Sequence, residues 1–103
     1  MVIELLKIRV PAEHREKYIQ VDAQIWTSML ASYPGFMGKE IWLDPANSTE
    51  VILIIRWASR QQWKSIPRER LVETEQLFLQ EFGVTEILEE AEYKVEKFQL
   101  ISE

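Results

Sequence analysis

Two acidic residues fall where apolar side chains are expected, each in the middle of a predicted long helix. In the stretch QVDAQIWTSML (residues 20–30), Asp22 interrupts an otherwise regular apolar stripe. With about 100° per residue and Tyr18 as the origin, Asp22 lies at about 40°, inside the apolar arc. On the second helix Glu75 lies at about 40° from Leu71, again among apolar neighbours. Each long helix is therefore predicted to direct one carboxylate toward the core.

A carboxylate buried alone costs several kcal/mol, so each acid needs a partner, hydrogen bonds or a proton. If Asp22 and Glu75 share a pocket, at least one has a raised pKa and could act as a general base or acid. They are our candidate catalytic residues. The alternatives are a structural salt bridge and an acid at an open edge of the stripe. The partners considered are the tyrosine hydroxyls and the following side chains: Lys7, Arg9, His14, Arg15, Trp26, Arg56, Trp63 and Arg68.

Four tryptophans in 103 residues suggest an aromatic-lined pocket, although core packing explains any one of them as well. Trp26, Trp57 and Trp63 are candidate pocket residues, since Trp57 ends a predicted strand and Trp63 follows it by one helical turn. Arg56 is the fourth candidate. It could bind an anionic ligand, or it could neutralise one of the two acids.

Composition excludes several other kinds of site. The chain has no cysteine and a single histidine, His14, so a metal site is not expected and no cofactor is predicted. Glycine-rich nucleotide-binding loops and the GxSxG hydrolase motif are missing. A net charge of -5 argues against nucleic-acid binding. The longest apolar run, residues 51–55, is too short for a membrane span, and no signal peptide is recognised, so a cytoplasmic protein is expected.

The predicted elements form one domain over residues 1–103 in the order β-α-β-β-α-β. The expected strands cover residues 2–10, 36–43, 49–57 and part of 93–101, the last after an acidic linker at 86–92. Helices are expected from 12 or 13 to about 33, from 59 to 66, and from 68 to 82. This order predicts an α+β, ferredoxin-like fold with an antiparallel sheet and both long helices on one face.

The third strand, TEVILIIRW (residues 49–57), is apolar at every central position. Both of its faces are therefore expected to be covered, although the helices cover only one. A second copy of the chain is the simplest cover for the other face, so a homodimer is predicted.

The segment from YPGF (residues 33–36) to RWASRQQWKSI (residues 56–66) resembles the antibiotic-biosynthesis-monooxygenase-like superfamily of dimeric α/β barrels. In that superfamily a Pro-Gly-Phe turn leads into the second strand. A tryptophan ends the third strand, and a short helix that begins with serine follows it. The chain looks closest to a small uncharacterised bacterial group of the cyanobacterial type.

The resemblance implies a homodimer with a pocket between each sheet and its helices. It also implies either cofactor-independent oxygenation of an aromatic substrate or haem degradation. Haem-degrading relatives bind iron through a histidine in the second helical region, and residues 60–82 contain none. The first hypothesis is therefore a small dimeric oxygenase or proton-transfer enzyme acting on an aromatic or apolar molecule. A non-catalytic ligand-binding module and a structural protein are the alternatives.

Overall fold

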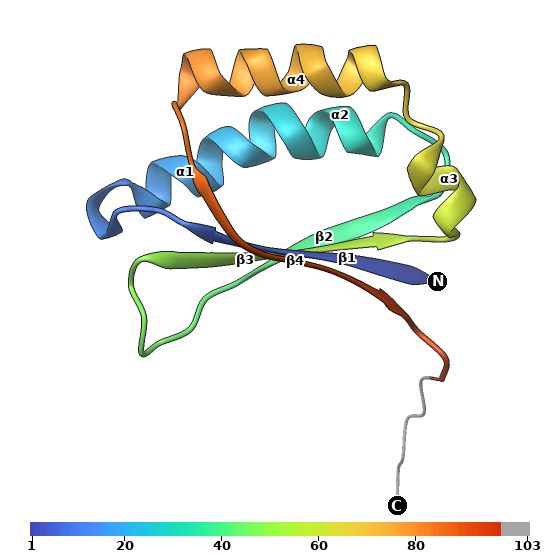
Figure 1. Ribbon diagram of the computed structural model, residues 1–103, viewed down its shortest axis with the longest axis horizontal. Helices are drawn as coiled ribbons and strands as arrows, with labels where there is room; N and C mark the ends of the chain where they lie inside the picture. The colour runs from blue at the N-terminus through green and yellow to red at the C-terminus, as the bar shows by residue number, and fades with distance from the viewer. Residues whose placement is uncertain (98–103) are drawn as a thin grey trace, which may run out of the picture.

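A computed structural model describes residues 1–97 as a single layer of helices packed on an antiparallel sheet (Figure 1). The strands are β1 (Val2–Arg9), β2 (Phe36–Trp42), β3 (Glu50–Trp57) and β4 (Glu86–Lys94). The helices are α1 (Arg15–Asp22), α2 (Ser28–Ala31), α3 (Arg60–Lys64) and α4 (Arg68–Glu81), with a 3-10 turn η1 (Ala12–His14) and a π-helical segment η2 (Ala23–Thr27). None of these helices is long and apolar enough to cross a membrane.

The sheet has the order β2-β3-β1-β4, and every neighbouring pair is antiparallel. Both long helical segments lie on the same face, so the other face has no cover within residues 1–97 (Figure 1). This is the predicted ferredoxin-like α+β arrangement, and the prediction is confirmed. β3 is flanked by a strand on each side, so its apolar side chains lie beside those of β1 and β2 on both faces of the sheet.

The last strand begins earlier than expected. Residues 86–92 were predicted to be an acidic linker, but they form most of β4, and the predicted residues 98–101 lie outside the described range. The prediction failed because β4 is an edge strand, where glutamates remain in solvent and pair with basic residues of β1. Lys7 contacts Glu89 and Arg9 contacts Glu86, both at 3.7 Å. Charged side chains are common on such edges because they discourage pairing with other chains.

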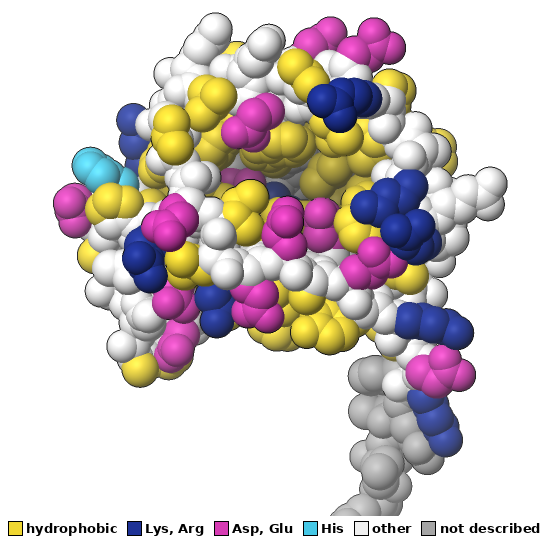
Figure 2. Space-filling model, in the orientation of Figure 1, with side chains coloured by type: hydrophobic (Ala, Val, Ile, Leu, Met, Phe, Trp, Pro, Cys, Tyr) yellow, Lys and Arg dark blue, Asp and Glu magenta, His cyan; other side chains and the backbone are white. Residues whose placement is uncertain are grey.

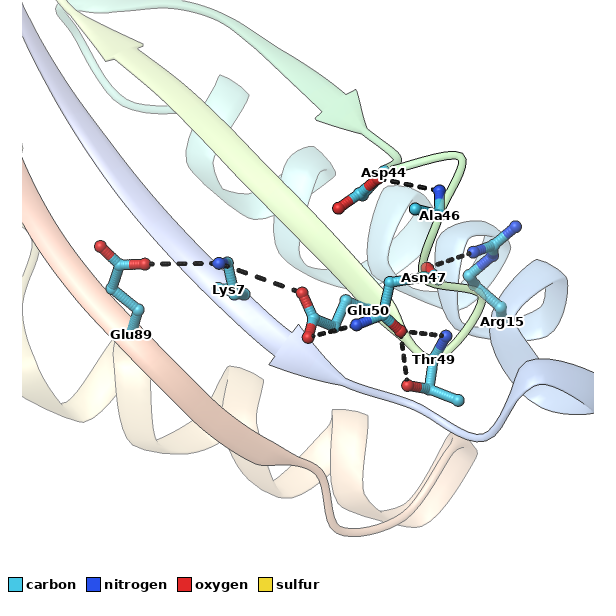
Figure 3. Close-up of polar contacts among 8 residues, drawn as sticks. All are labelled: Lys7, Arg15, Asp44, Ala46, Asn47, Thr49, Glu50 and Glu89. Carbon is cyan, nitrogen blue, oxygen red and sulfur yellow. Dashed lines mark hydrogen bonds and ion pairs between the residues drawn. The ribbon is translucent and has the colours of Figure 1, made fainter.

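The face of the sheet opposite the helices has a polar end and an apolar centre. At the polar end Lys7 lies between Glu89 and Glu50, 3.7 and 4.0 Å from their carboxylates (Figure 3). In the centre Leu5 pairs with Ile54 across the strands, and Ile54 is only 2% exposed although no helix covers it. The apolar centre is the surface on which the predicted second copy would pack.

The predicted turns and caps are found at the two ends of the helical layer. Ser59 begins α3, where its side chain accepts a hydrogen bond from the Gln62 amide at 3.1 Å. Asp44 organises the β2–β3 turn by accepting from the Ala46 amide at 2.9 Å (Figure 3). Gly35 ends the first helical region with a φ of 92°, and a Cβ there would meet the Gln62 side chain at 2.5 Å. Only glycine fits that position without displacement.

Candidate functional site

A cavity of about 200 Å³ lies between the helical layer and the sheet. It opens on the side where α4 faces β4; Figure 2 shows the hollow with hydrophobic side chains inside and acidic side chains near its rim. The lining is mostly apolar. Five of its side chains are polar or charged, and Tyr18 adds a hydroxyl group. Its members are Glu4, Leu6, Ile8, Tyr18, Asp22, Trp26, Leu30, Lys39, Leu53, Ile55, Glu75, Phe78, Thr85 and Ile87.

A buried ion pair forms part of the cavity wall. Asp22, at the end of α1, is 1% exposed, and the Lys39 side chain from β2 is 4% exposed. Lys39 Nζ donates a hydrogen bond to Asp22 Oδ2. Burial raises the pKa of the Asp22 carboxyl, and the charge and hydrogen bond of Lys39 oppose that shift. The pair keeps charged groups in contact with a mainly apolar cavity.

Glu75 also lines the cavity, but it lies at the rim and is exposed, not buried in a core. The residues of α4 that are buried are Thr74 and Phe78, whereas Leu71 and Val72 are exposed. The apolar side of α4, on which Glu75 was predicted to be buried, is therefore only partly covered by the rest of the protein. The reason is that α4 lies over the cavity and not directly on the sheet. The pKa of Glu75 is raised because its surroundings are partly desolvated.

Two further polar groups complete the lining. Glu4 of β1 and Lys39 of β2 lie opposite Ile55 of β3 on either side, so all three face the helices at the same level of the sheet. Burial raises the pKa of Glu4, and the positive charges of Lys64 and Lys39 oppose the shift. Burial also raises the pKa of the Tyr18 hydroxyl, as do the negative charges of Asp22 and Glu75. Tyr18 is thus electrostatically coupled to both candidate acids.

The four predicted pocket residues divide into two groups. Trp26 lines the cavity as expected. Trp57 is fully buried in the core against Phe36, with ring centroids 5.6 Å apart, and its indole N–H has no partner within the described residues. Trp63 lies outside the cavity wall, with Lys64 Nζ 4.0 Å from its ring centroid.

Arg56 also lies away from the cavity, on the opposite face of the sheet. Its side chain donates two hydrogen bonds to Glu40, at 2.9 and 2.6 Å. These bonds and one from Trp42 lower the pKa of Glu40. Arg56 therefore neutralises an acid, as one interpretation held, but the acid is Glu40 and neither of the two candidates.

Sequence reasoning missed Lys39, Glu4, Tyr18 and Thr85 as site residues, and Lys39 was not among the partners considered for Asp22. Glu4 could have been recognised, because it is the one charged residue on the face of β1 that also carries Leu6 and Ile8. Lys39 had no simple signal, because β2 is irregular between Phe36 and Gly38. Within residues 1–97 no group of three or more His, Cys, Asp or Glu side chains could hold a metal ion.

Solved structures of oxygenases share this fold. A monooxygenase from the gene ActVA-Orf6 of Streptomyces coelicolor, solved in complex with the ligand nanaomycin D, superposes with a TM-score of 0.75 at 14% identity; 98% of this chain and 92% of that chain are covered. SnoaB from Streptomyces nogalater, a cofactor-independent oxygenase, gives a TM-score of 0.67 at 12% identity and covers 94% of both chains. At such identities the similarity concerns the fold alone.

Sequence comparison identifies the family. A search of curated protein sequences found no match. The family model described as antibiotic biosynthesis monooxygenase matches residues 1–66, which include the first long helical region and the first three strands. The match covers well over half of the chain, and the residues it includes carry Asp22, Lys39 and Glu4. The chain belongs to the antibiotic biosynthesis monooxygenase family.

Proposed function

We propose that this protein is a homodimeric, cofactor-independent monooxygenase whose small, mainly apolar substrate binds in the cavity between helices and sheet. The observation that carries the proposal is the buried Asp22–Lys39 pair on the wall of that cavity. A charged group held in an apolar, enclosed site interacts strongly with a bound molecule because little water screens it. Membership of a monooxygenase family and the fold shared with a cofactor-independent oxygenase support this function.

The proposed reaction uses the substrate itself as the reductant. Asp22 accepts a proton from an acidic C–H or O–H of the bound molecule, and the substrate anion then donates electrons to molecular oxygen. In the overall reaction a CH₂ group and O₂ become a C=O group and water, so one oxygen atom enters the product and the other leaves with the two substrate hydrogens. Lys39 holds Asp22 in place and compensates its charge, and Glu75 is the second candidate acid at the rim.

The cavity volume constrains the substrate. About 200 Å³ is smaller than the roughly 300–1,000 Å³ of typical small-molecule sites. Aromatic molecules of two or three rings are therefore the largest suitable substrates. The ring of Trp26 on the cavity wall offers a stacking surface for such a molecule.

The homodimer is proposed from the uncovered face of the sheet. Trp42 and Tyr93 are exposed there, around the apolar centre formed by Leu5 and Ile54. Replacing Tyr93 with glutamate should dissociate the dimer, measured by native mass spectrometry, because a charge would be buried without a partner. Leu79→Glu is the control, since Leu79 is also a large exposed hydrophobic residue, 40% exposed against 52% for Tyr93, but lies on α4. A monomeric wild-type protein would refute the dimer.

The activity test measures oxygen consumption and product mass with two- and three-ring aromatic compounds such as anthrone, with and without amino substituents. Asp22→Asn should abolish turnover while substrate binding persists. Tyr18→Phe, on the same cavity wall, should lower turnover less than Asp22→Asn does. Glu81→Gln is the control, since Glu81 is exposed on α4 and does not line the cavity. Full activity of Asp22→Asn would refute the role of Asp22 as the base.

A non-catalytic ligand-binding module is the second candidate, and one observation favours it. Asp22 already has a close partner in Lys39, which makes it a weaker base than a free buried carboxylate. That function predicts saturable binding of aromatic molecules to the cavity with no oxygen consumption at any pH. The same oxygen-electrode and binding measurements therefore separate the two functions.

A further inference from the structure

The ionisable groups of the cavity carry an excess of negative charge. Three carboxylates line it, from Glu4, Asp22 and Glu75, against one cation, Lys39. Lys39 is bound to Asp22, so the charges of these two residues compensate each other. Within residues 1–97 neither Glu4 nor Glu75 forms an ion pair with a basic side chain. The wall thus contains two carboxylates without a direct ion pair, and on Glu4 the positive charges of Lys64 and Lys39 act only from beyond ion-pair distance.

The remaining wall consists of rings and aliphatic side chains. Tyr18, Trp26 and Phe78 line the same enclosed volume as the carboxylates. The faces of aromatic rings carry negative partial charge and attract cations, most strongly where water is excluded. Carboxylates combined with aromatic rings form the usual composition of sites for organic ammonium groups, whereas a site for an anionic ligand needs a free cation or a cluster of backbone amides.

We propose that the cavity selects a small aromatic molecule that carries a protonated amine, with the ammonium group held by Glu4 or Glu75 and the apolar body packed against Trp26. This inference rests on the proposed function, in that it assumes the cavity is the ligand site, and it adds the charge class of the ligand. A bound ammonium group donates charge-assisted hydrogen bonds to carboxylates that otherwise remain partly desolvated without a partner.

Lys39 does not prevent cation binding at the two glutamates. Glu4 and Lys39 are separated by β3, so their backbones lie two strand spacings apart, about 10 Å. Glu75 lies on α4 at the rim, on the side of the cavity that opens beside β4. The negative charges of Glu90 and Glu92 on β4 also act on Glu4, although Lys64 and Lys39 oppose them more strongly and Glu92 is paired with Arg60 at 2.6 Å. A cation in the cavity therefore meets the carboxylate of Glu4 on the sheet and that of Glu75 on α4.

The experiment compares three ligands that share one ring system and differ in charge. At pH 7 1-naphthylmethylamine is a cation, 1-naphthalenemethanol is neutral and 1-naphthoate is an anion. Isothermal titration calorimetry on the full chain should give an affinity for the amine about tenfold or more above that for the alcohol, which corresponds to ~1.4 kcal/mol. The naphthoate should bind more weakly than the alcohol because the two free carboxylates repel it.

Glutamine variants then identify the groups responsible. Glu4→Gln and Glu75→Gln each remove one charge and keep nearly the same shape. At least one of them should lower the affinity for the amine about tenfold, ~1.4 kcal/mol. The same variant should leave the affinity for the alcohol unchanged. Unchanged alcohol binding also shows that the variant is folded. Glu81→Gln is the matched control, since Glu81 is an exposed glutamate of the same helix as Glu75 and does not line the cavity.

The outcomes separate this inference from the proposed function. Equal binding of the amine and the alcohol, or no effect of either glutamine variant, would overturn the cation preference and leave the cavity as a ligand site. Tighter binding of the naphthoate would overturn it as well. If none of the three ligands binds, while the protein is folded by circular dichroism, both the ligand site and its charge preference are refuted.

Discussion

Replacing Lys39 with methionine tests whether the Asp22–Lys39 pair is buried as the structure shows. The change removes the charge and leaves a side chain of similar length, so Asp22, which is 1% exposed, loses its only ion-pair partner within residues 1–97. Breaking a buried pair on one side typically costs ~3–5 kcal/mol of unfolding free energy. We expect a loss near the lower part of this range at pH 7.

The upper limit of that loss follows from protonation. An Asp22 carboxylate without a partner can accept a proton, which costs ~1.4 kcal/mol for each pH unit above its ordinary pKa of 3.8. The penalty therefore cannot exceed about 4 kcal/mol at pH 7 and falls to about 2 kcal/mol or less at pH 5. The sign is fixed by the raised pKa of the buried carboxyl in the folded state. The protein loses stability as the pH rises from the ordinary pKa of the carboxyl toward the raised one.

The assay is urea unfolding followed by tryptophan fluorescence between pH 5 and 7, at one protein concentration. Lys94→Met is the control, because Lys94 is exposed and its contact with Glu96 is on the surface. The double variant Asp22→Leu with Lys39→Met should recover most of the lost stability, since neither charge is left alone. A loss below ~1 kcal/mol at pH 7, or a loss independent of pH, would refute the buried pair.

Three further predictions concern the positioning elements. Gly35→Ala should lower the unfolding free energy by ~1–3 kcal/mol, because φ is 92° and the new Cβ meets Gln62; a smaller loss in a urea melt would contradict the close approach. Ser59→Ala should lower the unfolding free energy by ~1 kcal/mol, because the side-chain cap of α3 is lost, whereas Ser59→Asp should preserve it. Equal unfolding free energies for the two variants in urea would refute the cap. Arg56→Met should leave ligand affinity in calorimetry unchanged, because Arg56 contacts Glu40 on the opposite face; a tenfold change would contradict that placement.

Much of the fold was predictable because it depends on local patterns. The break after β1, the Ser59 cap, the turn at 44–48 and the end of α4 before Gly83 all have strong residue signals. Asp22 was placed correctly for the same reason, since helical periodicity over α1 is regular up to the π-helical segment that follows it. The acidic strand β4 was missed because composition alone does not distinguish an edge strand from a solvated linker.

The exposure of Glu75 could not be predicted from its own helix. The same periodicity that placed Asp22 in a core placed Glu75 among Leu71, Val72 and Leu79, yet these apolar side chains are exposed in the structure. Periodicity identifies the apolar stripe of a helix but not how far the helix stands from the sheet. That distance depends on the side chains beneath it, and here the space beneath α4 is the cavity.

Two irregularities in the strands explain why the lining itself was hidden. A regular alternation from Phe36, which faces the helices, would send Lys39 to the opposite face. The extra residue between Phe36 and Gly38, where Gly38 has a φ of 136°, reverses the alternation and directs Lys39 toward Asp22.

A second shift of register in β4, opposite Lys7 and Ile8, brings Ile87 to the helix-facing side at the cavity opening. Bulges re-aim side chains in this way because one added residue exchanges the two faces of a strand. Both irregularities lie in the outermost strands of the sheet, where an unpaired residue costs the fewest backbone hydrogen bonds. The cavity thus obtains its lysine and part of its rim from departures from regular pairing, which neither composition nor simple periodicity reveals.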